Sequence, residues 1–236
     1  MKSQLALLLP IRCISFIIIF LCIHSITNKE YSNLTNCWSV VCSIVNIVLI
    51  LILILLTKLN KSNYFELINY EKKKTRIKDV VIMCIIVLSV GMGVMWLSGL
   101  IFYQKFPYLP SEIISPLPIW VSIIVFLILP ISTALAEEGL YLGCGVNSID
   151  NKYLKIAIPS LFFALQHSFI PFFPDIKFMG YRFLSFLPLT IILCIIHSKK
   201  KNPLPIIIAH TLIDLFTVIW ILIASINPEI YNQMLS

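Results

Sequence analysis

Apolar residues along this chain come in long, nearly uninterrupted blocks, and short polar stretches separate them. About 20 apolar residues cross the hydrocarbon core of a bilayer as a helix. The first block is interrupted by Pro10 and Arg12, the fourth contains Pro130 and is either tilted or broken, and Pro171 and Pro174 end the short fifth block. The pattern predicts seven transmembrane helices, over residues 5–26, 38–57, 80–103, 118–146, 154–172, 180–197 and 203–225.

Composition narrows the class of protein further. The 236 residues are 59% hydrophobic and 12% charged, with a mean hydropathy of +0.95. Soluble domains are about 45–50% apolar and about 25% charged. The chain is therefore predicted to be an all-α polytopic membrane protein, a bundle of about seven transmembrane helices with any functional site inside the helical core. The polar stretches leave no room for a separate soluble domain.

The formal net charge of +7 indicates the orientation of the chain in the membrane. We do not take it as a sign of nucleic-acid binding, and we exclude nucleic acid as a partner. Seven basic residues lie in Lys58–Lys78 and three more in Lys199–Lys201. Basic connections stay in the cytoplasm, so both are predicted to be cytoplasmic, with the C-terminus on the other side. The low-Gly, Lys- and Asn-rich composition suggests a bacterium with an AT-rich genome and hence the plasma membrane. The seven scattered cysteines predict neither disulfides nor a zinc motif.

A few ionisable residues lie within the apolar blocks that are predicted to span the membrane. Such groups cost about 2.5–3.5 kcal/mol on insertion scales, face the bundle interior and usually have a partner. Glu137 and Glu138 lie in the fourth block, His167 in the fifth, and His210 and Asp214, four residues apart and on one helix face, in the seventh. We take these five as the deeply placed ionisable groups, and we predict that they meet in one cavity.

Several kinds of chemistry fit such a cavity. A carboxylate can activate water as a general base, and an imidazole can hold the oxyanion that forms when water attacks an amide. The same residue types could hold a metal ion with an open position or carry protons or cations in a transporter. Spacing alone does not separate these alternatives, although the zinc-protease motif H-E-x-x-H is missing from the sequence.

Three short segments resemble the motifs of a known family. The segments are EEGLYL at 137–142, FALQH at 163–167 and HTLID at 210–214. Their order and separation resemble E-E-x-x-x-R, F-x-x-x-H and H-x-x-x-N/D in the CAAX-prenyl-protease and bacteriocin-processing (CPBP or Abi) family of intramembrane proteases. The resemblance covers a catalytic membrane core over residues 118–225, whereas the N-terminal spans of residues 1–117 carry no motif.

The resemblance implies an intramembrane endopeptidase that cleaves a membrane-associated peptide or protein, in bacteriocin maturation or in self-immunity. By that resemblance Glu137 would activate water and His167 would position it. His210 and Asp214 would hold the oxyanion, and Glu138 would support the site. The family resembles glutamate proteases that need no cofactor, so we expect no bound metal, although zinc stays open.

One position departs from the family motif. Leu142 stands where the family has Arg, and that Arg would pair with Glu138 at i, i+4. We therefore expect Glu138 to lack its local partner, and Arg182 is the basic residue considered as a substitute. The departure favours an alternative function, a non-catalytic membrane immunity or binding protein. An ion-coupled transporter is a further alternative, but the spans show no inverted repeat.

Other residues near the motifs have plainer interpretations. Phe163, one turn before His167, is predicted to contribute to substrate binding. Gly139 and Gly143 form a G-x-x-x-G pattern, which usually lets helices approach closely. His24 and His197 lie at span ends, where a histidine near water is expected to have no special role.

Overall fold

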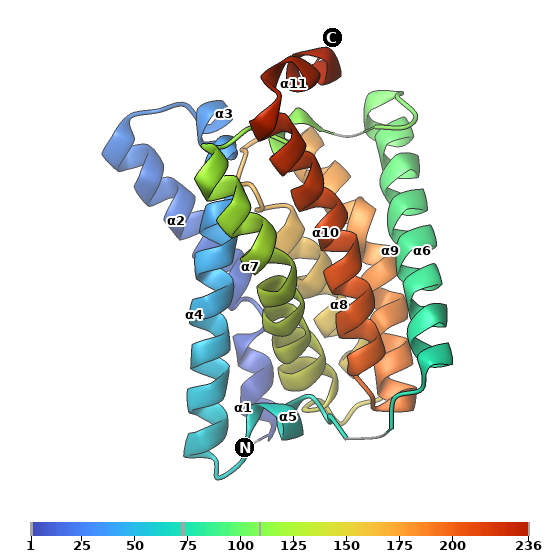
Figure 1. Cartoon of the computed structure of the whole chain (residues 1–236). Helices are drawn as coiled ribbons and strands as arrows, with labels where there is room; N and C mark the ends of the chain where they lie inside the picture. Colours follow the sequence, from blue (N-terminus) through green and yellow to red (C-terminus); the bar gives the residue numbers. More distant parts are fainter. Residues whose placement is uncertain (1, 72–73, 109, 236) are drawn as a thin grey trace.

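The computed structural model of the chain describes residues 2–71, 74–108 and 110–235 and is a bundle of long helices (Figure 1). Among the described residues, six helical segments are long and apolar enough to cross a membrane: Ala6–Thr27, Tyr31–Leu59, Ile77–Tyr103, Ile119–Val146, Ile176–Lys200 and Leu204–Ile226. The described residues contain no β-strand, only an isolated bridge between Phe169 and Phe172. The predicted all-α membrane class is confirmed, and the protein is an integral multi-pass membrane protein.

The elements succeed one another along the chain in a simple order. They are α1 (Lys2–Leu5), η1 (Ala6–Leu8), α2 (Ile11–Thr27), α3 (Tyr31–Leu34), η2 (Thr35–Cys37), α4 (Trp38–Leu59), α5 (Tyr64–Leu67), α6 (Ile77–Tyr103), η3 (Ser111–Ile113), α7 (Ile119–Glu137), η4 (Glu138–Val146), α8 (Leu154–His167), α9 (Ile176–Lys200), α10 (Leu204–Ile226) and α11 (Pro228–Leu235). The two ends of the chain lie at opposite ends of the bundle (Figure 1).

The fifth predicted span differs from the other six. It forms α8, which has 14 residues and stops at His167 rather than at residue 172. At 1.5 Å per residue this helix is about 21 Å long, shorter than the roughly 30 Å hydrocarbon core. Six full-length spans and one short inner helix therefore replace the seven predicted spans. Because α8 stops short, its last side chain lies within the bundle and not at its end.

The fourth span is continuous in spite of Pro130. It consists of α7 followed directly by η4, a π-helical segment that begins at Glu138. π-helical turns shift the side chains that follow around the helix axis and are frequent at functional sites. Gly139 lies in this segment, and a methyl group on it would come within 2.8 Å of Leu53 Cδ1 and 2.9 Å of the Tyr64 hydroxyl. The predicted packing role of the glycine pattern is thus confirmed at this position.

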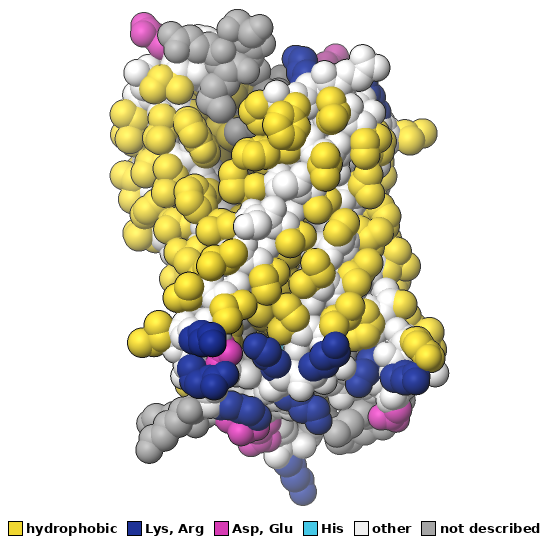
Figure 2. Space-filling model, turned by 90° about the vertical axis from the view of Figure 1, so that its right-hand side faces the viewer, with side chains coloured by type: hydrophobic (Ala, Val, Ile, Leu, Met, Phe, Trp, Pro, Cys, Tyr) yellow, Lys and Arg dark blue, Asp and Glu magenta, His cyan; other side chains and the backbone are white. Residues whose placement is uncertain are grey.

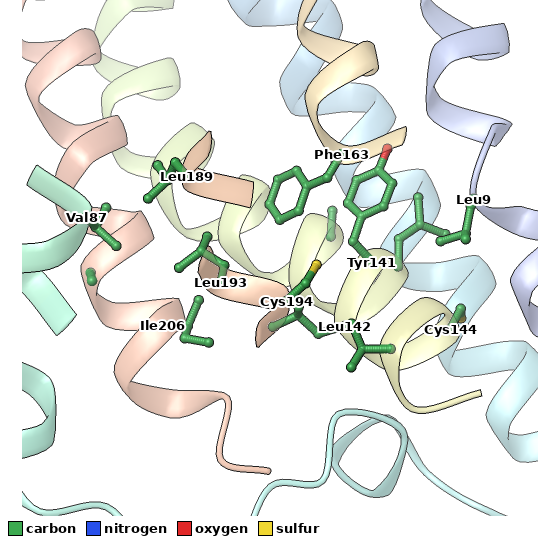
Figure 3. Close-up of a cluster of buried hydrophobic side chains, with 14 of the residues drawn as sticks. Leu9, Val87, Tyr141, Leu142, Cys144, Phe163, Leu189, Leu193, Cys194 and Ile206 are labelled. Carbon is green, nitrogen blue, oxygen red and sulfur yellow. The ribbon is translucent and has the colours of Figure 1, made fainter. Parts of the chain in front are cut away.

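The helices around η4 enclose an apolar core (Figure 3). In the bundle, α7 packs against α4 and α10, whereas α8 contacts α2, η4 and α9. Tyr141 is directed toward Phe163, and Leu142 projects from the same ribbon in another direction (Figure 3). Leu142 is fully buried in a cluster of side chains that includes Leu49, Leu53 and Leu193. The position at which the resembled family has an Arg is therefore part of the hydrophobic core.

The surface carries an apolar belt with a basic band at one end (Figure 2). Large apolar side chains are exposed along the long helices, as lipid contact requires. The band follows the ends of helices that turn back there: Lys58 is in the last turn of α4, and Lys199 and Lys200 end α9. Lys200 lies 3.5 Å from Asp79 near the start of α6. The basic residues thus lie at one end of the apolar belt (Figure 2).

Candidate active site

The five ionisable residues predicted to meet do lie together, in the middle of the bundle. Glu137 ends α7, Glu138 begins η4 and His167 ends α8, while His210 and Asp214 lie on α10. Both glutamates are completely buried and both histidines nearly so. Three segments far apart in the sequence thus contribute to one polar cluster, in which neighbouring members lie within 4 Å of each other.

Glu137 Oε2 lies at the centre of this cluster. It is 3.9 Å from His167 Nε2 and 3.7 Å from His210 Nε2. Among the described residues, neither Glu137 Oε2 nor His167 Nε2 has a hydrogen-bond partner. These separations are too long for direct hydrogen bonds but suit contacts bridged by one small polar molecule.

His210 is oriented by Glu138 rather than by Asp214. Its Nδ1 lies 2.8 Å from Glu138 Oε1, a buried hydrogen bond across two helices. Its Nε2 is thereby directed to Glu137, and Asp214 Oδ2 lies 3.6 Å away, beyond hydrogen-bond distance. Glu138 thus pairs with an imidazole from α10 rather than with a base on its own helix or with Arg182.

Glu137 has a cationic partner outside the five predicted residues. Arg12 of α2 is almost completely buried, and its Nη2 lies 2.8 Å from Glu137 Oε1. The set of five deeply placed ionisable residues was therefore incomplete. Arg182, the substitute considered, instead donates from Nε and Nη2 to the carbonyl oxygens of His167 and Ile170, at 3.3 and 3.1 Å.

Aromatic rings fix the histidine side chains. His167 stacks on Phe186 with a centroid separation of 3.5 Å and an interplanar angle of 8°. Phe163 stacks on Tyr141 at 4.6 Å, and its ring centroid lies 6.1 Å from that of His210. Phe163 thus packs against the site and contributes to the wall of a cavity. The four-residue spacing of Phe163 and His167 made this position predictable from the sequence, whereas no sequence pattern indicated Phe186.

An apolar cavity of about 380 Å³ adjoins the cluster. Glu137, both histidines and Asp214 lie along it, and most of its remaining wall is apolar. Side chains of α6 and α10 line its outer part, and three of them are also exposed on the surface of the bundle: Met92, Phe216 and Trp220. The cavity therefore joins the buried carboxylate to the apolar surface between α6 and α10.

Metal ligands are not arranged as a set in this site. The residues that the structure describes contain no group of three or more His, Cys, Asp or Glu side chains placed to hold a metal ion. Moreover, one oxygen of Glu137 is bonded to Arg12, and a cation in that place competes electrostatically with a metal ion. The expectation of a metal-independent site stays a prediction.

The other two histidines lie apart from the cluster. His24 is near the end of α2 and stacks on Tyr31. His197 is completely buried, unlike the interfacial histidine expected, and its Nε2 lies 3.1 Å from Asn147 Oδ1. Asn147 follows η4 directly, so His197 connects the end of that segment to α9.

Comparison with known proteins gives one family match. Residues 118–216 match the model of a family described as type II CAAX prenyl endopeptidase Rce1-like. No curated protein and no solved structure matches the chain. The match begins just before α7 and ends within α10, so it includes all five residues of the cluster and leaves out Arg12. The resemblance inferred from the three motifs is confirmed.

Proposed function

Residues 118–216 belong to the Rce1-like family of type II CAAX prenyl endopeptidases, which implies an intramembrane protease, and from this premise we propose a specific reaction. The protein hydrolyses a peptide bond of a membrane-associated peptide or protein, with Glu137 as general base. The observation that carries the proposal is the position of Glu137 Oε2, which lies within 4 Å of two imidazole Nε2 atoms and beside a cavity.

The first step is the attack of water on the scissile carbonyl. A substrate water between Glu137 Oε2 and His167 Nε2 would be within hydrogen-bond reach of both, since the two atoms are 3.9 Å apart. Glu137 takes one proton from this water as its oxygen bonds to the carbonyl carbon. Stacking on Phe186 keeps the His167 ring in the plane that this contact needs.

The second step is collapse of the tetrahedral intermediate. As an imidazolium, with Nδ1–H on Glu138 and Asp214 beside it, His210 would donate its Nε2–H to the oxyanion, and fixed donors at that point stabilise the transition state. Glu137 then returns its proton to the leaving amine, the C–N bond breaks, and an acid and an amine are released. No group outside the site and the substrate water is required.

The surroundings of the site indicate the substrate class. An apolar cavity that continues to the surface between α6 and α10 suits a peptide that arrives from the bilayer with an apolar attachment or side chains. We assign the basic band to the cytoplasmic side of a bacterial plasma membrane. A role in bacteriocin maturation or self-immunity fits such a substrate.

Glu137→Gln provides the test, with Glu71→Gln as the matched control in an exposed loop. Membranes of cells that express each form are compared for new peptide termini, and peptides whose cleavage depends on Glu137 are then assayed with purified protein in liposomes. We expect cleavage to fall at least about 10³-fold in Glu137→Gln and to be unchanged in Glu71→Gln. Persistent cleavage in Glu137→Gln would remove Glu137 from the role of base.

The same variants address the non-catalytic alternative. If cells expressing Glu137→Gln keep full immunity to a bacteriocin while no peptide is cleaved by either form, the protein acts by binding. Loss of both immunity and cleavage in Glu137→Gln, with both retained in Glu71→Gln, supports the protease.

A further inference from the structure

Arg12 is the deepest charged residue of the N-terminal helices, which lie outside the family match. A guanidinium inside a span is costly unless it is paired and hydrogen-bonded. In α2 it stands one residue after the helix begins at Ile11, yet only 1% of its surface is exposed. The helical segments before and after Pro10 are separate, so α2 begins inside the bundle. This start brings Arg12 into contact with Glu137.

Each nitrogen of the Arg12 guanidinium faces an acceptor on a different helix. Nη2 donates to Glu137 Oε1 on α7 at 2.8 Å, Nε donates to Gln166 Oε1 on α8 at 2.5 Å, and Nη1 donates to Asn46 Oδ1 on α4. The Phe16 ring lies 5.3 Å below the guanidinium carbon. The planar, rigid fork of Arg suits such a three-way contact, whereas the ammonium of Lys does not.

The two neutral acceptors are themselves held in place. Gln166 Oε1 also accepts from the Tyr141 hydroxyl at 2.9 Å, and Asn46 Nδ2 donates to Thr133 Oγ1 at 2.8 Å. Thr133 lies one turn before Glu137 on α7, and Tyr141 lies one turn after it on η4. Arg12 is therefore fixed from both sides of the carboxylate that it contacts.

As a consequence, the two carboxylate oxygens of Glu137 have different contacts. Oε1 is engaged by Arg12, so Oε2 is the oxygen presented to the two histidines. The guanidinium also places a positive charge directly beside the buried carboxylate, which compensates for its burial.

We infer that Arg12 is a positioning residue of the active site, supplied by α2 from outside the three motif segments. It acts through Glu137 and makes the N-terminal helix part of the catalytic unit. The inference rests on the proposed role of Glu137 as base.

The test compares Arg12→Gln, Arg12→Lys and the surface control Arg76→Gln, each purified in liposomes. The substrate is the peptide whose cleavage is lost in Glu137→Gln. Misplacing a reacting group by about 1 Å costs about 10²-fold, so kcat per folded molecule should fall about 100-fold in Arg12→Gln, with KM changed less than about 3-fold. Arg12→Lys should recover at least about 10-fold of that loss, because it keeps the charge. Arg76→Gln should match the wild type.

A purely structural ion pair would behave differently. Arg12→Gln would then lower the melting temperature but leave kcat per folded molecule unchanged, and this outcome overturns the inference. Cleavage that persists in Glu137→Gln instead overturns the proposed function, so the two failures are distinct.

A second variant tests the inference if Arg12→Gln does not fold. Gln166→Leu removes the acceptor of Arg12 Nε and of the Tyr141 hydroxyl while it leaves Arg12 in place. It should lower kcat about 10-fold, and an unchanged kcat overturns the inference.

Discussion

Replacing Glu138 with Gln removes a negative charge while it keeps an oxygen within reach of His210 Nδ1. The bond between Glu138 Oε1 and His210 Nδ1 is 2.8 Å long and fully buried. A hydrogen bond to a charged group contributes about 1.5–3 kcal/mol, and one between neutral groups about 0.5–1.5 kcal/mol. The substitution therefore removes about 1–2 kcal/mol from the orientation of His210. If His210 stabilises the transition state, kcat falls about 5- to 30-fold, since about 1.4 kcal/mol corresponds to a factor of ten.

Glu138→Ala extends this prediction, because it leaves His210 Nδ1 without any acceptor among the described residues. An unsatisfied buried donor costs about 1–3 kcal/mol beyond the lost bond, so kcat should fall by about 100-fold or more. Rates are measured with purified protein in liposomes, with Glu71→Gln as control and Glu137→Gln as reference. A Glu138→Gln protein as inactive as Glu137→Gln would refute the reasoning, because Glu138 would then react directly. A Glu138→Gln protein with the wild-type rate would also refute the reasoning, because the charge of Glu138 would then not matter for His210.

Two further predictions concern packing and metal dependence. Gly139→Val should lower the free energy of unfolding by about 1–3 kcal/mol, because its side chain would overlap Leu53 and Tyr64; thermal melting in detergent measures the loss, and an unchanged melting temperature would show that α4 and α5 can move aside. Millimolar chelators should leave cleavage unchanged, because Arg12 already neutralises Glu137; inactivation that added zinc reverses would contradict this prediction.

The membrane class and most of the spans followed from hydropathy. Length and apolarity are sufficient to place a helix across a bilayer, since the unpaired backbone of any other structure is too costly there. The exception is α8, where residues 169–172 are apolar yet not helical. Pro171 in the sequence indicates a helix end nearby but not the residue at which α8 ends. In the structure α8 ends at His167, and Arg182 donates to the carbonyl oxygens of His167 and Ile170 that the end of the helix leaves free.

The cost of buried charge identified the site but was applied to too few residues. It selected Glu137, His167 and His210, which do lie together. The same rule applied to Arg12 adds a sixth ionisable residue to the five that it selected. In the sequence, Pro10 and Arg12 indicate only an interruption of the first apolar block.

Sequence by itself determined that this chain spans a membrane repeatedly and that its few intramembrane carboxylates and imidazoles belong together. Both conclusions depend on transfer free energies, which each residue carries irrespective of its neighbours. Tertiary structure alone decided which groups pair: Arg12 with Glu137, and Glu138 with His210. A helix that is apolar on every face carries no pattern that fixes its rotation or depth. The π-helical segment after Glu137 shifts that rotation again, so these pairings emerge only when the helices are packed together.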